Sequence, residues 1–281
     1  MRLFLLVVFI LSNQFCFSQT KNAKDIATKM LTACDNMKTA KYVLKKQERQ
    51  KDNTLRESEL IVKLQVNPYK TYSYSVNPNP GAEALYISGE NSGKVFVNPN
   101  QFPYVNLNLD PYGSTLRENQ HHTVLDMGFK YISSIVKAYI KNDEAGFFGN
   151  LSYDGEIEWN KKSCYKLTFD NKKFSYVTYT VQAGETLTSI AKKMNVSDFM
   201  ILTANPNIDD YDDVKTGQKI KVPNSYAQKI VFYIDKTNYL PLVQIIYDDK
   251  GLFEKYELNS FILNPTFNLE EFTSKYKDYK F

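Results

Sequence analysis

The two histidines of the chain, His121 and His122, have side chains suited to metal binding or to acid–base chemistry. Either function needs both imidazole rings to face the same ligand. Neighbouring residues on a strand point to opposite sides, and no H-x-x-x-H, H-E-x-x-H or Cys-His spacing adds a further ligand. We therefore expect the pair to pack where a helix begins, with a metal or catalytic site as the alternative.

Three other groups could carry chemistry. Cys34 and Cys164 could pair as a disulfide or act as nucleophiles, but no local motif supports a nucleophile, and buried free thiols are the simpler interpretation. Glu156 and Glu158 lie two apart on a predicted strand, so both carboxylates face one side and could form a hydrolytic pair. An acidic run lacks the glycine and distal glutamate of a calcium loop: Asp209, Asp210, Asp212 and Asp213. We expect no metal and no cofactor.

Residues 179–223 carry the clearest pattern of elements. A strand runs into a turn at Gly184, and apolar residues then recur at helical spacing from Leu187. Ser197 supplies an N-cap for a second short helix, which ends at Asn205-Pro206 because proline cannot continue a helix. A strand from Lys219 closes the segment, so the pattern predicts a βααβ unit.

This unit resembles a LysM domain, the module that binds N-acetylglucosamine-containing glycans such as peptidoglycan and chitin. The resemblance is carried by Y-x-V-x-x-G-E-T-L-x-x-I-A from Tyr179, by Val196-Ser197, by Asn205-Pro206 and by G-Q-x-I-x-V-P up to Pro223. Thr216 departs from the pattern, since the family often has proline there. The match covers about a sixth of the chain.

In LysM domains the sugar lies in a shallow groove between the loop after the first strand and the loop after the second helix. The resemblance therefore implies a glycan site formed by Gly184, Glu185, Thr186 and Leu187 on one side and Pro206, Asn207, Ile208 and Asp209 on the other. Tyr211 is expected to stack on a sugar face. The alternative is that Gly184, Thr186 and Leu187 serve only the turn, the helix cap and the core.

The first residues indicate export. Arg2 precedes an apolar run, Leu3–Leu11, which is too short for a bilayer-spanning helix of roughly 20 residues but has the layout of a secretory signal peptide. We expect residues 1–19 to be this signal peptide, no lipidation at Cys16, and no transmembrane segment. Removing residues 1–19 takes away one positive charge, Arg2, so the net charge falls from +4 to +3. That weak charge argues against a nucleic-acid partner.

The remaining residues, 20–178 and 224–281, are predicted to form a host domain of strands with alternating polarity, of which Leu60–Val66 is the clearest. Two helices with single apolar stripes are predicted over about residues 23–38 and 123–141. The fold class is therefore α+β: a curved, incompletely closed antiparallel sheet of about 11 strands with two packed helices. We expect the βααβ unit at 179–223 to be inserted between two adjacent host strands, since its paired ends lie side by side.

The order of host elements resembles that of periplasmic lipoprotein carriers and outer-membrane lipoprotein-sorting proteins. Two segments look like an uncharacterised bacterial family of this type: Asp110–Phe129 and Ile234–Tyr256. In such proteins a curved sheet wraps helices and leaves a hydrophobic concavity. The resemblance implies an apolar or lipid-like ligand there.

These features predict an exported binding protein, without enzymatic activity, in the periplasm or cell envelope of a Gram-negative-type bacterium. Its LysM domain would bind peptidoglycan or another N-acetylglucosamine glycan, and its host domain an apolar or lipid-like ligand. The rival is a cell-wall-targeted hydrolase. A third possibility is a purely structural interaction protein, whose sheet interior would be fully packed.

Overall fold

The computed structural model of the protein describes residues 23–281. The predicted signal peptide at residues 1–19 lies outside this range. The host domain starts with a helix over residues 23–36. Six strands follow: β1 (Thr39–Arg49), β2 (Leu55–Gln65), β3 (Lys70–Asn77), β4 (Glu83–Ile87), β5 (Val95–Asn98) and β6 (Leu107–Leu109). Five more complete the host domain: β7 (Leu151–Trp159), β8 (Lys162–Asp170), β11 (Lys229–Asp235), β12 (Pro241–Asp248) and β13 (Gly251–Leu263).

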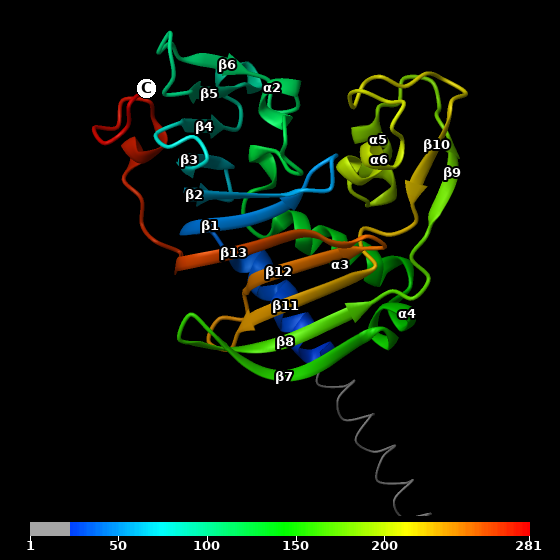
Figure 1. Ribbon diagram of the computed structural model, residues 1–281. Helices are drawn as coiled ribbons and strands as arrows, with labels where there is room; N and C mark the ends of the chain where they lie inside the picture. The colour runs from blue at the N-terminus through cyan, green and yellow to red at the C-terminus, as the bar shows by residue number, and fades with distance from the viewer. Residues whose placement is uncertain (1–22) are drawn as a thin grey trace, which may run out of the picture.

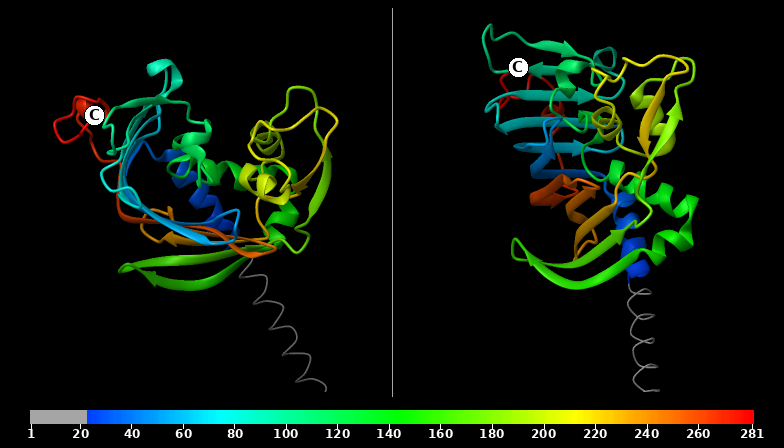
Figure 2. Two further views of the ribbon diagram at one scale, coloured as in Figure 1. Left: turned by 45° about the horizontal axis from the view of Figure 1, so that its top comes forward. Right: turned by 45° about the vertical axis from the view of Figure 1, so that its right-hand side comes forward.

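These 11 strands form one antiparallel sheet in the order β6-β5-β4-β3-β2-β1-β13-β12-β11-β8-β7. The sheet is open, with β6 and β7 as its edges, and it curls into a trough (Figure 2). On β1 the inward residues are buried at every second position, as the period-two alternation requires. The predicted fold class is confirmed.

Helices fill the hollow of the trough. The helix over residues 23–36 and α3 (Lys130–Asn142) lie on the concave face (Figures 1 and 2). The second helix was predicted as one piece from about 123 to 141, but the structure divides it into a 3-10 turn, η2 (Val124–Asp126), and α3. Gly128 causes the break, because its φ of +86° is left-handed and a Cβ there would lie 2.5 Å from Leu64 Cδ2.

Four short helical turns were not predicted, because each is too brief to show a period. They are η1 (Asn91–Gly93), α2 (Ser114–Arg117), α4 (Glu144–Gly149) and η3 (Leu269–Phe272). Within residues 23–281, no helix is long and apolar enough to span a membrane.

The βααβ unit consists of β9 (Tyr176–Thr180), α5 (Leu187–Met194), α6 (Asp198–Ala204) and β10 (Lys219–Pro223). It lies between β8 and β11, which pair directly, with Asp170 opposite Lys229. We expected the host domain to extend to residue 178, but β9 already begins at Tyr176 and pairs only with β10, in a separate two-stranded sheet. Thr186 and Ser197 cap the two helices with their side chains, accepting from Ser189 N and Met200 N.

Candidate functional site

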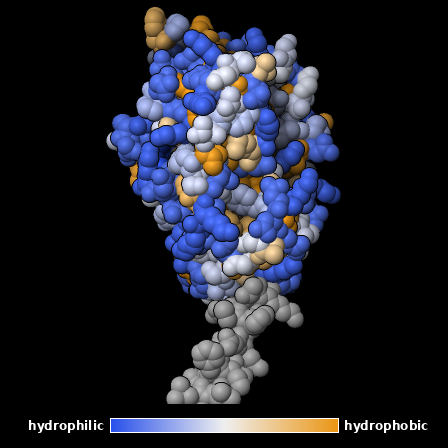
Figure 3. All heavy atoms as spheres, turned by 90° about the vertical axis from the view of Figure 1, so that its right-hand side faces the viewer, coloured by the Kyte–Doolittle hydropathy of each residue, from blue (hydrophilic) through white to orange (hydrophobic). Residues whose placement is uncertain are grey.

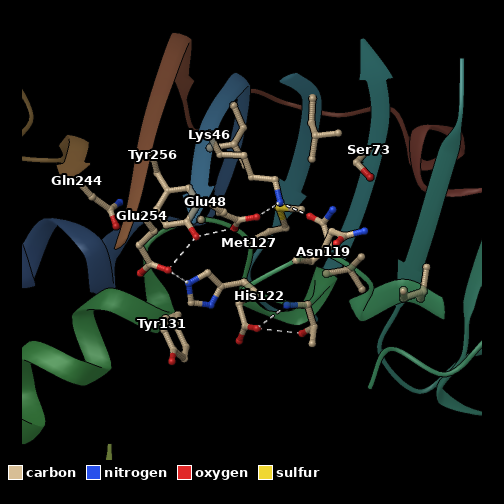
Figure 4. A pocket seen from close by; sticks show the side chains of 18 of the residues that line it. Lys46, Glu48, Ser73, Asn119, His122, Met127, Tyr131, Gln244, Glu254 and Tyr256 are labelled. Carbon is tan, nitrogen blue, oxygen red and sulfur yellow. Dashed lines mark hydrogen bonds and ion pairs between the residues drawn. The ribbon is translucent and has the colours of Figure 1, made fainter. Parts of the chain in front are cut away.

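A cavity of about 400 Å³ lies between the concave face of the sheet and the segment Thr115–Ile132. We call it the host cavity. On the sheet side it is lined by β1, β2 and β13, and Figure 4 shows Lys46 and Glu48 projecting from β1 beside Glu254 and Tyr256. Its volume is within the range of small-molecule sites, about 300–1,000 Å³. The sheet interior is therefore not fully packed.

The polar part of this cavity is a buried cluster of charged side chains. Glu254, fully buried on β13, accepts from His121 Nδ1 at 2.9 Å and lies 3.3 Å from His122 Nε2. The Tyr256 hydroxyl lies 2.7 Å from Glu48 Oε1 and 3.1 Å from Glu254 Oε2, and the Tyr226 hydroxyl donates to Glu254 Oε1. Lys46 Nζ lies 3.1 Å from Glu48 Oε2 and also donates to Gln120. We call these eight residues the ionic cluster.

His121 is held by hydrogen bonds at both of its ring nitrogens. Its Nε2 lies 2.9 Å from the carbonyl oxygen of Arg49, which can only accept, and its Nδ1 meets the Glu254 carboxylate. Both ring nitrogens of His121 thus face oxygen atoms, one on the Arg49 backbone and one on the Glu254 side chain. Phe199 stacks on the His121 ring and Phe253 packs against it at a tilt, with centroid distances of 4.1 and 4.3 Å.

His122 lies next to His121 and also approaches the Glu254 carboxylate. Burial opposes its charged form, but the Glu254 carboxylate outweighs burial and raises the pKa of His122 to about 9. Burial likewise opposes ionisation of Glu254, and the two histidines hold its pKa well below the ordinary value. Burial of Glu48 is outweighed by Lys46, so the pKa of Glu48 is also lowered. The cluster consists of opposed charges at neutral pH.

The sequence-based expectation for the histidines was incomplete. They precede η2, as expected, and within residues 23–281 no group of three or more His, Cys, Asp or Glu side chains is placed to hold a metal ion. Their partners, however, come from β1 and β13, which are distant in sequence. Only the inward charged positions of β1, Lys46 and Glu48, could have signalled the cluster, because buried charges need partners.

The structure brings together the two loops of the predicted glycan site. Leu187 N donates to the carbonyl of Tyr211 at 2.8 Å, so the loop after β9 and the loop after α6 are directly joined. The nine predicted residues differ in exposure: Gly184, Pro206, Asn207 and Asp209 are exposed, Glu185 and Thr186 are half-buried, and Leu187, Ile208 and Tyr211 are buried.

Several groups of these loops are already engaged within the domain. The N–H groups of Glu185, Thr186 and Leu187 donate to Gln182 O, Ser189 Oγ and Tyr211 O. The Glu185 carboxylate accepts from Gln182 N, which lowers its pKa, and from Lys193 and Tyr179. Among the described residues, none hydrogen-bonds to the Asn207 side chain. The Asp209 carboxylate is likewise exposed, so Gly184, Asn207 and Asp209 offer free polar groups in the groove.

Tyr211 is placed differently from the expectation. Its ring is 7% exposed and lies under the Arg117 guanidinium, whose carbon is 3.3 Å from the ring centroid. Arg117, on α2 of the host, also donates to Asp198 at 2.7 Å and to Thr188 at 2.9 Å. In this arrangement Tyr211 holds the LysM domain on the host and has no free face for a sugar.

The other candidates lie apart from the cavity. Cys34 and Cys164 are buried free thiols, and burial raises their pKa values to about 12 and about 11. Glu156 and Glu158 are exposed on the edge strand β7, where Lys236 pairs with Glu156 at 2.6 Å. The four residues of the acidic run are exposed on the loop before β10.

An open antiparallel sheet with helices and a cavity on its concave face is the carrier-like fold that the sequence resemblance predicted. A family model described as protein of unknown function (DUF1571) matches residues 37–183, just over half of the chain. The chain belongs to this family. A LysM domain model matches residues 179–223, so the LysM resemblance is confirmed over the predicted range.

Solved structures with similar folds share little sequence with the chain. MucB is 9% identical, with a TM-score of 0.43, over 90% of this chain and 62% of MucB. The Mycobacterium tuberculosis lipoprotein LppX is 13% identical, with a TM-score of 0.42, over 88% and 98%. A putative outer membrane lipoprotein-sorting protein domain from Vibrio parahaemolyticus is 10% identical, with a TM-score of 0.35, over 91% and 97%. No curated protein sequence matches the chain.

Proposed function

We propose that the protein is an exported binding protein of the bacterial cell envelope that attaches to peptidoglycan through its LysM domain. The observation that carries this proposal is the pair of joined LysM loops, with Gly184 and Asn207 exposed and free to contact a sugar. The side of the molecule that carries the LysM domain is mostly hydrophilic (Figure 3). Such a face suits a glycan, which is recognised by hydrogen bonds.

Titration with N-acetylglucosamine oligomers tests this site. Asn207→Trp places a large side chain in the groove, so it should abolish binding measured by calorimetry. Lys219→Trp is the matched control, because Lys219 is exposed on β10 of the same domain and is not one of the nine predicted groove residues. Equal affinity of the Asn207 variant and the unmodified protein would place glycan binding elsewhere.

The second part of the proposal is an apolar or lipid-like ligand in the host cavity. One end of the cavity is lined by Leu44, Leu60 and Leu258, and it is large enough for part of an acyl chain. The other end carries the ionic cluster, so a purely apolar ligand would leave that end unmatched. A ligand with both an apolar and a polar part fits better.

Displacement of a fluorescent fatty acid tests the cavity. Leu60→Trp fills the apolar end and should weaken binding at least tenfold. Ile61→Trp is the control, because Ile61 follows Leu60 on β2, faces the other side of the sheet and does not line the cavity. If both variants bind the probe as the unmodified protein does, the probe does not occupy this cavity.

We also propose that the protein does not hydrolyse the wall. The carboxylate pair considered from the sequence, Glu156 and Glu158, lies on an exposed edge strand, and glycoside hydrolysis needs two carboxylates flanking a bound sugar. Incubation with peptidoglycan should release no soluble fragments. Release that is lost in Glu156→Gln would establish the hydrolase instead.

A further inference from the structure

The polarity of the host cavity changes in one direction along β1. The central strand β1 is flanked by β2 and β13, and its inward residues form rows across the three strands. One row is entirely leucine: Leu60, Leu44 and Leu258. Two residues further along β1 the row is Ser58, Lys46 and Tyr256, and the next is Arg56, Glu48 and Glu254. The cavity is thus apolar at one end and charged at the other.

The charged end points to the LysM domain. β1 continues from Glu48 into the turn at residues 50–54, where Lys51 Nζ donates to the Asp209 carbonyl at 3.0 Å. Asp209 belongs to the second loop of the predicted glycan groove. The direction from Leu44 to Glu48 therefore leads from the apolar end of the cavity to the LysM loops.

A cleft of about 720 Å³ lies between this turn, α2 and the LysM domain. We call it the interdomain cleft. On the LysM side it is lined by α6 and by Asp209, Asp210 and Tyr211. Arg56, Glu118 and Asn119 line both the interdomain cleft and the host cavity. These three residues form the junction between the two spaces.

Arg56 leaves hydrogen-bond donors free at this junction. It lies opposite Glu48 on the neighbouring strand, yet no carboxylate of the described residues pairs with it within 4.0 Å. The Glu48 carboxylate oxygens instead accept hydrogen bonds from Lys46 and Tyr256. An arginine with unused donors can hold the hydroxyl, carbonyl or anionic oxygens of a polar head group.

The two domains are fixed relative to each other at this point. Arg117 connects α2 to Asp198 and Thr188, and the stacking of Phe199 on His121 adds a contact with the ionic cluster. The segment between β10 and β11 also contacts the host. Tyr139 Oη lies 2.6 Å from Ser225 Oγ, and the Tyr226 hydroxyl donates to Glu254. These contacts connect the groove and the cavity in the arrangement that one extended ligand would span.

We infer that the LysM domain and the host cavity bind one molecule, a glycolipid with an N-acetylated amino-sugar head and an apolar chain. The chain lies at the leucine row, the linkage passes Arg56 at the junction, and the sugar reaches the loops at Asn207 and Asp209. The inference rests on the proposed function, because it takes the two predicted sites and assigns them to a single ligand.

A conjugate of N-acetylchitotriose with a dodecyl chain tests this assignment, measured by calorimetry below the micelle concentration. Its separate parts, N-acetylchitotriose and dodecanoate, are titrated alongside. A linked ligand gains affinity because its second contact becomes intramolecular. We expect the conjugate to bind at least a hundredfold more tightly than either part, and each part to compete with it. Dodecyl maltotrioside, which lacks acetamido groups, should not show this gain.

Arg56→Trp narrows the junction and should reduce the affinity for the conjugate to the affinity that the same variant shows for its better-binding part. Arg56→Lys keeps a donor there and should retain most of the gain. If the parts bind but the conjugate gains nothing, or if the gain survives Arg56→Trp, the single-ligand inference is wrong and the proposed function stands. If neither part binds, the proposed function fails and the inference fails with it.

Discussion

The charge on His122 predicts a specific loss of stability in mildly alkaline solution. In the folded protein its pKa is raised to about 9, mainly because the Glu254 carboxylate outweighs the effect of burial. The ordinary value is 6.5. A raised pKa means that the folded state binds the proton more tightly than the unfolded state does. The stabilisation is therefore complete below pH 6.5 and disappears as the pH rises through about 9.

The size of the effect follows from the difference between the two pKa values. About 2.5 units correspond to about 3 kcal/mol, because one unit is worth about 1.4 kcal/mol. At pH 8.5 part of this stabilisation is still present. Between pH 6 and pH 8.5 the free energy of unfolding should therefore fall by about 2 kcal/mol.

Urea denaturation at pH 6, 7, 8 and 8.5 measures this loss. His122→Gln removes the titrating group. Between pH 6 and pH 8.5 the free energy of unfolding of this variant should therefore fall by about 2 kcal/mol less than that of the unmodified protein. The comparison between proteins cancels the contribution of the two thiols. Lys130→Gln, an exposed change at the start of α3, should leave the pH dependence as it is. Parallel pH profiles for His122→Gln and the unmodified protein would refute the charged state of His122.

Three further predictions concern the packing of the domains. Arg117→Met leaves Asp198 partly buried without its partner, so it should lower the free energy of unfolding by about 3 kcal/mol in urea denaturation. Adding Asp198→Asn should restore part of this loss. A loss below about 0.5 kcal/mol for Arg117→Met would contradict a stabilising contact between Arg117 and Asp198. Asn205→Ala removes three hydrogen bonds, one to Ile201 O and two to the backbone groups of Lys221. The free energy of unfolding should therefore fall by about 2 kcal/mol or more. An unchanged midpoint of urea denaturation would contradict this prediction. Cys34 and Cys164 should react with a thiol reagent at pH 8 only after unfolding, because burial raises their pKa values to about 12 and about 11; fast labelling of the folded protein would show that they are accessible.

Local patterns predicted much of the fold. The period-two runs identified most strands, and the caps at Thr186 and Ser197 with Asn205-Pro206 defined the LysM helices, because these signals depend on neighbours in sequence. Gly128 shows the limit of periodicity. The apolar stripe continues across it, but the backbone there is left-handed, and Leu64 from a distant strand leaves no room for a side chain at this position.

The candidate site was harder to predict, because its parts meet only through tertiary structure. Glu254 is separated from His121 by 133 positions, and neither residue belongs to a motif. Tyr211 was assigned to a sugar from its place in the LysM pattern, but the host supplies Arg117, which covers the ring. A domain inserted between two strands acquires such contacts from its host, and the pattern of the isolated module does not contain them.

Attachment to peptidoglycan is the central claim, and co-sedimentation of residues 20–281 with purified insoluble peptidoglycan tests it most directly. Point variants suit this better than removal of the LysM domain, since that would uncover His121 and break the Arg117 contacts. We predict that the unmodified protein and Lys219→Trp sediment with the wall material, whereas Asn207→Trp stays in solution. If the correctly folded, unmodified protein stays in solution, the LysM domain does not attach the protein to the wall and the proposed function is wrong.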